Sequence, residues 1–294
     1  MCIKHIVIHF FCLINRRHKM RASGIYANVD IDIYHSEEGI SSTGINLILD
    51  CPKRYAYDKF EKLKNKESEA EHFKLGRALH MLVLEPHKFD NAFYQMTEKV
   101  KLNTTKGKEI YAKAEIEAEG RQILRSGEIE DIYGMAQAMK EHKLWQHLKA
   151  GEMEQSIYWE GGGLWSTRLR ARPDVFTAEI IVDVKSCRSI NEFKRSIYGR
   201  GYHRQAAMQI DGLNHIDGIK RHFAFFVVES TAPYLTACFT LDDASIEQGR
   251  KEYRQGADIY TECTKLNNWP GYDSNFQLAS IPAWSMRTDD DILI

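Results

Sequence analysis

The stretch from Leu164 to Ser186, LWSTRLRARPDVFTAEIIVDVKS, decides the fold that the rest of the chain is expected to adopt. Side chains alternate between the two faces of a strand, so Asp183 and Lys185 point to one face and their apolar neighbours to the other. Asp174 ends the preceding run, and residues 177–179 read as a turn between two antiparallel strands. The pattern predicts that two carboxylates and an amine meet on one sheet face.

A divalent metal site follows from this arrangement. Two carboxylates at a strand spacing repel each other unless a cation lies between them, and oxygen ligands favour Mg²⁺, for which Mn²⁺ can substitute. A metal held by Asp174 and Asp183 would lower the pKa of a bound water, while Lys185 orients that water or stabilises developing negative charge. This chemistry suits hydrolysis of a phosphodiester. For the motif alone, the alternative is a solvent-exposed ion pair at a strand end.

The composition is that of a globular protein, but it does not indicate what the protein binds. The 294 residues are 43% hydrophobic and carry a net charge of −1, so a nucleic-acid partner is neither indicated nor excluded. Two local basic clusters could line a groove: Arg168, Arg170 and Arg172, and Lys194, Arg195, Arg200 and Arg204. The six cysteines include no Cys-x-x-Cys pair, which favours a reducing, cytoplasmic location over a disulfide framework or a zinc site.

The N-terminal end is set apart from the fold. Residues 1–22 contain an apolar run that is too short to span a membrane and lacks a cleavage site for secretion. We expect an extension here, either disordered or the product of an over-extended start. Residues 23–294 are expected to form a single domain without a membrane segment.

Elsewhere the pattern predicts helices and strands in a mixed order. Strands are expected over 154–159, 164–172, 180–185, 222–229 and 234–240, with the first three forming an antiparallel meander. A capped helix is expected after Ser41, a short helix after a capping box formed by Ser189 and Glu192, and long helices from Tyr202 and Asp242.

Several further polar residues become candidates only if the fold brings them to the two aspartates. His80 lies in a nearly all-apolar helix, residues 75–84, where a histidine is more often a core residue than a ligand, and Arg77 shares its face. Glu154, near the start of a strand, could add a carboxylate, although a surface position is the commoner fate. Gln205 and Gln209 share one helix face and could hold a water or a phosphate.

Taken together in order, these pieces resemble the PD-(D/E)XK nuclease superfamily, and within it the RecE-type (exodeoxyribonuclease VIII-like) branch of phages and prophages. The similarity covers most of residues 26–285. Each piece is weak by itself, and the ordered set carries the resemblance: Tyr34-His35-Ser36 with Ser41-Ser42, the Cys51-Pro52 helix end, Gly76 to His80, Glu154 to Trp159, Arg172-Pro173-Asp174, Asp183-Val184-Lys185-Ser186, Tyr202 with Gln205-Ala206-Ala207, and Trp269-Pro270-Gly271-Tyr272. The implied fold is α/β, a restriction-endonuclease-like core with a mixed sheet of about five strands flanked by helices.

The resemblance also implies roles for individual positions. The matching residues would be the metal ligands His80, Asp174, Asp183 and the Val184 carbonyl, the catalytic residue Lys185, and Gln205 beside the scissile phosphate. Glu154, Arg77 and Gln209 remain further candidates. Gln209 stands where the family commonly has tyrosine, so a contact with DNA is expected to be altered there.

The activity implied by the resemblance is Mg²⁺-dependent degradation of linear double-stranded DNA from the 5′ end. The product is a 3′ single strand for a RecT-like annealing protein, and the enzymes assemble as ring-like homo-oligomers. Because the chain lacks the late cysteine cluster of some related nucleases, we expect no iron–sulfur cluster. The alternatives are an endonuclease or flap nuclease of the same fold, or a catalytically silent DNA-binding module.

Overall fold

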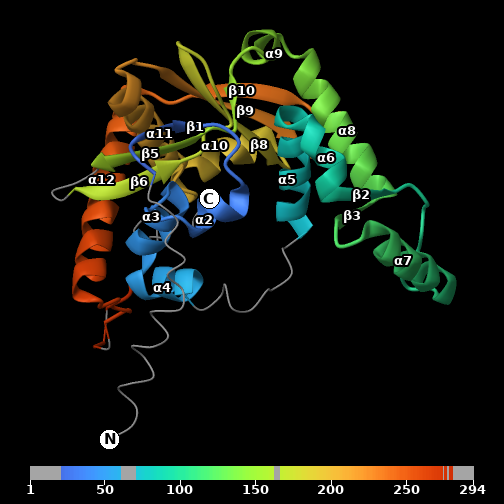
Figure 1. The fold of residues 1–294 in the computed structure, drawn as a ribbon, viewed down its shortest axis with the longest axis horizontal. Coiled ribbons are helices and arrows are strands. Elements are labelled where there is room, and N and C mark those ends of the chain that lie inside the picture. Colours follow the sequence, from blue (N-terminus) through green and yellow to red (C-terminus); the bar gives the residue numbers. More distant parts are fainter. Residues whose placement is uncertain (1–20, 61–70, 162–165, 274, 277, 281–294) are drawn as a thin grey trace, which may run out of the picture.

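The structure is a computed structural model that describes residues 21–60, 71–161, 166–273, 275–276 and 278–280. A mixed five-stranded sheet lies at its centre, in the order β10-β9-β8-β7-β4 (Figure 1). The middle strand is β8 (Ile180–Cys187), which pairs parallel with β9 (His222–Glu229) along its whole length and antiparallel with β7 (Val175–Phe176). The edges are β10 (Thr236–Thr240) and β4 (Glu152–Met153). The expected mixed sheet of about five strands is therefore confirmed.

A second sheet corrects the predicted three-stranded meander. β5 (Ser156–Gly161) and β6 (Thr167–Ala171) pair antiparallel, as expected, but β1 (Gly24–Tyr26) completes their sheet and β8 belongs to the other one. The chain changes sheets at Pro173, which lacks the N–H that a continuing ladder would need. The glycines at 162 and 163 of the predicted hairpin turn lie outside the described residues.

Helices surround these sheets, and their bounds are as follows: α2 (Ile31–Ser36), α3 (Ser42–Asp50), α4 (Pro52–Phe60), α5 (Glu71–Leu84), α6 (Pro86–Ala92), α7 (Thr105–Ala118), α8 (Ser126–Glu141), α9 (Lys143–Leu148), α10 (Ile190–Gly199), α11 (Tyr202–Asp217) and α12 (Asp243–Leu266). Between α6 and α8, the short parallel strands β2 (Phe93–Met96) and β3 (Gln122–Arg125) form a separate pair that the sequence did not predict. In Figure 1, α7 extends from this pair away from the rest of the molecule.

The two faces of the five-stranded sheet bury two different cores. Val182 and Val184 of β8 pack with α5, α6 and α8, whereas Ile181 packs with α3, α11 and α12 on the other face. This follows from the period-two alternation of a strand, which places residues of opposite parity on opposite faces. As a result, β8 is covered on both sides and its polar residues are held rigidly.

Helix ends follow the predicted caps with one exception. Ser41 and Asp242 accept hydrogen bonds from the backbone N–H groups of Gly44 and Ser245, as their sequence context indicates. The predicted capping box of α10 is wrong, because the Ser189 side chain makes no cap hydrogen bond. Instead, the Ile190 N–H donates to Glu229 Oε1 at 2.9 Å, so β9 supplies the cap.

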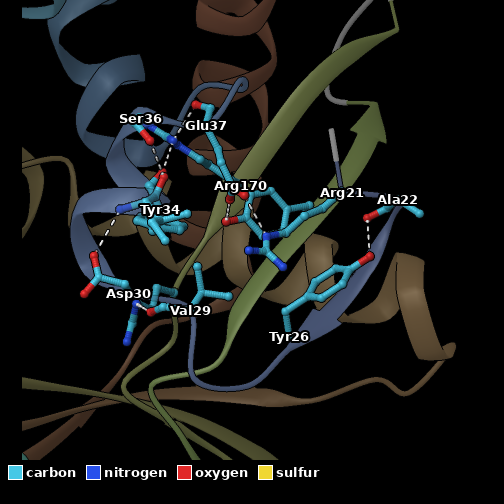
Figure 2. Close-up of polar contacts among 12 residues, drawn as sticks. Arg21, Ala22, Tyr26, Val29, Asp30, Tyr34, Ser36, Glu37 and Arg170 are labelled. Atoms are coloured by element: carbon cyan, nitrogen blue, oxygen red, sulfur yellow. Dashed lines mark hydrogen bonds and ion pairs between the residues drawn. The ribbon is translucent and has the colours of Figure 1, made fainter. Parts of the chain in front are cut away.

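The segment from Arg21 to Glu37 is fixed to the body by buried arginines of β6. Arg170 donates to the backbone carbonyls of Tyr34 and Glu37, and Figure 2 shows these three residues together. Arg168 donates in the same way to the carbonyls of Arg21 and Ala22. Both guanidinium groups are buried, so the expectation that this cluster lines a groove is wrong.

The expected N-terminal extension, residues 1–22, lies outside the described residues apart from Arg21 and Ala22. Among the residues that are described, no helix is both long and apolar enough to cross a bilayer.

Candidate active site

Three potential metal ligands from different parts of the chain meet at one edge of β8. His80 comes from α5, Glu154 from the residues between β4 and β5, and Asp174 from the residue before β7. One ligand atom of each lies within 4.8 Å of the others. His80 Nδ1 is 3.5 Å from Asp174 Oδ2 and 3.9 Å from Glu154 Oε1. One imidazole and two carboxylates therefore face a common point.

His80 is oriented by the backbone of β8. Its Nε2 lies 2.9 Å from the Val184 carbonyl oxygen, so this nitrogen carries the proton and donates it. The other nitrogen, Nδ1, is thereby directed at the carboxylates. Burial lowers the pKa of His80, but the charges of Asp174 and Glu154 outweigh burial and raise it to about 9.

Asp174 is held by the same strand. Its Oδ2 accepts a hydrogen bond of 2.6 Å from the Val184 N–H, and only 7% of the residue is exposed. Burial is the main cause that raises the pKa of Asp174 to about 7, and the nearby negative charge of Asp183 acts in the same direction. A cation at this point would relieve both effects, because it favours the ionised carboxylate.

Glu154 reaches the site through its backbone conformation. Its φ is +51°, in the left-handed region that few non-glycine residues adopt, and its N–H donates to the Asp174 carbonyl at 3.0 Å. Arg172 Nε donates to Glu154 Oε2 at 2.8 Å. Burial raises the pKa of Glu154, but His80 and Arg172 more than offset this and hold it below its usual range. From the sequence, a surface position was the commoner expectation for Glu154, because its place near a strand start does not reveal the left-handed backbone conformation.

Asp183, Lys185 and Gln205 form a second polar group beside the first. Gln205 Nε2 donates to Asp183 Oδ1 at 2.6 Å, and the Lys185 ammonium contacts the other oxygen of Asp183. Asp183 is 1% exposed. Burial lowers the pKa of Lys185, but the charges of Asp183 and Asp174 raise it overall. Lys185 is therefore an ammonium ion at neutral pH.

An aromatic layer supports Lys185. The Lys185 nitrogen lies 5.2 Å from the centre of the Tyr202 ring, which stacks on Phe193 of α10. A cation over an aromatic face is attracted by the ring quadrupole, so the ring helps to hold the amine in place. The sequence pointed to Tyr202 only as part of the motif that contains Gln205, and its contact with Lys185 was not predicted.

Two other candidate residues lie differently. The Arg77 guanidinium lies over the ring of Phe93, the first residue of β2, at 5.3 Å from the ring centre. Gln209 is 3% exposed, and its Oε1 has no hydrogen-bond partner in the described part of the chain. Neither belongs to the group of three ligands around His80.

The donor set fits a divalent cation. Carboxylate oxygens and an imidazole nitrogen suit Mg²⁺ or Mn²⁺, and the histidine has the backbone hydrogen bond that orients metal-ligating imidazoles. The pKa values of Asp174 and His80 are raised partly because negative charges crowd together here. A bound cation would neutralise that negative charge.

A family comparison agrees with this geometry. Residues 41–279 match the model of a PDDEXK-like domain of unknown function (DUF3799). The chain belongs to this family. The PDDEXK-like domain places it in the PD-(D/E)XK nuclease superfamily, whose members use divalent metals, and the matched range includes every residue of the site.

A solved structure shows the same fold as this PDDEXK-like domain. A candidate exonuclease from Eubacterium rectale aligns with a TM-score of 0.61 at 12% identity, covering 90% of this chain and 98% of the other. A phage-related exonuclease from Haemophilus somnus aligns over 80% of this chain and 100% of its own at 13% identity, with a TM-score of 0.30. The alkaline exonuclease of Laribacter hongkongensis aligns over 65% and 96% at 14% identity, with a TM-score of 0.28. No curated protein matches the chain.

Proposed function

We propose that this PDDEXK-like domain is a Mg²⁺-dependent exonuclease that degrades linear double-stranded DNA from 5′ to 3′ and leaves 3′ single-stranded tails for recombination. The observation that carries the proposal is the meeting of His80, Glu154 and Asp174 beside Asp183 and Lys185. The similar solved protein described as an exonuclease supports the choice of exonuclease, and the RecE-type order of motifs supports the polarity.

The chemistry follows from these side chains. His80 Nδ1, Glu154 and Asp174 would hold the cation, with Asp183 beside them and the Val184 carbonyl as a further candidate ligand. When bound there, a divalent cation would lower the pKa of a water and place positive charge near the phosphate. Lys185 keeps its proton because its pKa is raised, so it stabilises negative charge on the reacting phosphate and does not act as a base. Gln205 holds Asp183 in position, and the resemblance implies that it would lie beside the same phosphate.

Labelled DNA ends test the proposal. A linear duplex carrying separate 5′ and 3′ labels is incubated with Mg²⁺ or with EDTA, and the wild type is compared with Lys185→Met and Asp183→Asn. We expect early release of the 5′ label in Mg²⁺ alone. Both variants should lose cleavage by at least about a hundredfold, because each changes charge at the reacting phosphate, and both should retain DNA binding.

Closed circular DNA separates the alternatives. An exonuclease leaves a covalently closed plasmid intact, whereas internal cuts would establish an endonuclease, and cuts at branched junctions a flap nuclease. Absence of cleavage with Mg²⁺ and with Mn²⁺ would establish a silent DNA-binding module.

A further inference from the structure

Three exposed arginines differ from all the others that the structure describes. Most arginine side chains in the described ranges contact a carboxylate, a backbone carbonyl or an aromatic ring, such as Arg170 on Tyr34 or Arg250 on Asp211. Arg188, Arg195 and Arg200 make no such contact within those ranges, and all three are exposed. Their charges are therefore free to bind an external anion.

These arginines belong to one element, helix α10 and the residues that flank it. The segment 188–204 contains five lysines and arginines and one glutamate, in a chain whose net charge is −1. Lys194 and Arg195 are exposed on α10, four and three residues before the exposed Tyr198, while Phe193 is buried. We call the exposed cations of this segment, Arg188, Lys194, Arg195 and Arg200, the cationic stripe.

The position of α10 connects this stripe with the candidate active site. The segment begins three residues after Lys185 and ends just before Gln205. Phe193 stacks on Tyr202, with ring centres 5.7 Å apart, and the Lys185 nitrogen lies 5.2 Å from the centre of the Tyr202 ring. Figure 1 shows α10 beside β8 and α11, the elements that carry Lys185 and Tyr202. The aromatic pair therefore joins the helix that carries the stripe to the amine.

We infer that Arg188, Arg195 and Arg200 form the surface on which the phosphate backbone of the duplex rests while its end is cut. This inference rests on the proposed function and adds the contact surface for its substrate. Unpaired arginines bind phosphate without reading bases, and such contacts fix the register of DNA on a protein. The stripe would hold the strand so that the phosphate to be cut lies at Lys185.

Salt dependence of DNA binding measures such contacts directly. Each phosphate neutralised by a protein cation contributes about 0.9 to the slope of log affinity against log salt concentration. The test compares the wild type with the triple variant R188Q/R195Q/R200Q, using anisotropy of a labelled linear duplex in EDTA, which prevents cleavage. We expect the slope to fall in magnitude by about 2 to 3 and the affinity at 0.1 M salt to fall at least tenfold.

A matched control removes the same charge from another place. Lys101, Lys106 and Lys108 are exposed at the start of α7, on the part of the molecule that extends away from the sheet (Figure 1). The triple variant K101Q/K106Q/K108Q should bind DNA as the wild type does, within about twofold. Both triple variants should keep the wild-type melting temperature, since none of the six side chains is buried.

The outcomes are distinguishable. Wild-type affinity and slope in the α10 variant would overturn this inference while leaving the nuclease proposal intact, and so would equal losses in the two triple variants. A wild-type protein that neither binds nor cleaves linear duplex DNA would overturn both. A larger loss of DNA affinity in the single variant R195E than in R195Q would confirm that the charge of Arg195, and not the integrity of the helix, is responsible for the weaker binding.

Discussion

At the scale of the residue, Glu154 shows how a carboxylate enters a site by backbone geometry. Its positive φ turns the side chain toward Asp174 in the two-residue gap between β4 and β5. The left-handed backbone conformation is unfavourable for a non-glycine residue. It persists where the surrounding structure fixes it, commonly at functional sites. Here the fixing contacts are the Asp174 carbonyl and the Arg172 guanidinium.

Glu154→Gln is expected to weaken metal binding. The exchange removes one negative charge from the three ligands, so Mn²⁺ affinity measured by isothermal titration calorimetry should fall by more than the tenfold typical of outer-shell changes. Mg²⁺-dependent cleavage should fall with it. Glu152→Gln is the matched control, because Glu152 is exposed and lies two residues earlier in the same segment. Equal metal affinity in wild type and E154Q would contradict a role for Glu154 as a ligand.

The sequence predicted part of this site for a clear reason. Parity along β8 placed Asp183 and Lys185 together, and the structure shows them in contact. Parity could not place Glu154, because a single left-handed residue resets the alternation at that point. His80 was named as a ligand only through the family resemblance, because its partners Glu154 and Asp174 lie more than 70 residues away and the periodicity of its own helix does not reveal them.

At the scale of the element, α5 and α8 are joined by one buried carboxylate. Glu128 of α8 accepts from the Arg125 N–H at 2.7 Å and pairs with Lys74 of α5 at 2.6 Å. Burial raises the pKa of Glu128, but the hydrogen bonds and charges of Arg125 and Lys74 lower it to about 2. Because α5 carries His80, this ion pair helps to hold the helix that supplies the histidine.

Glu128→Gln is expected to destabilise the protein in a pH-dependent way. The folded pKa lies below the ordinary value of 4.5, so the carboxylate stabilises the fold fully above pH 4.5 and this stability is lost as pH falls toward 2. The free energy of unfolding in urea should fall by about 3 kcal/mol at pH 7 and by much less at pH 3. Glu130→Gln, which alters an exposed pair with Lys99, should change it by under about 0.5 kcal/mol. A pH-independent loss in E128Q would disprove this account.

Elements were predictable where the pattern was long. Four elements were predictable from sequence: β8 from its alternation, β9 from its β-branched and aromatic residues, and α11 and α12 from their helical patterns. β2 and β3 were not predicted because their four-residue segments, FYQM and QILR, are too short for a period that would distinguish a strand from a helix. The α10 cap escaped for another reason, since Glu229, which caps it, lies 39 residues away from Ile190.

At the scale of the whole molecule, the RecE-type resemblance leads us to expect a closed ring of subunits. A ring around the duplex would keep the enzyme on one DNA molecule through many cuts. Light scattering should therefore give a mass of three or more chains. Excess unlabelled duplex added after digestion starts should not shorten the tract removed from each labelled end. A monomer that releases its DNA after each cut would contradict the expectation.

The order of the strands also determines at what point during synthesis the side chains of the candidate active site can be held in place. Every residue from Ile180 to Cys187 pairs with a residue of β9, which leaves the ribosome some 40 residues later, and Gln205 lies between the two. Pairing of parallel strands must wait for the helices that connect them. A nascent chain that ends before β9 thus has all the acidic side chains of the site, but β8 lacks the strand with which it makes its longest pairing. A translation product cut short there is accordingly expected to lack the rigid site that metal binding and cleavage require.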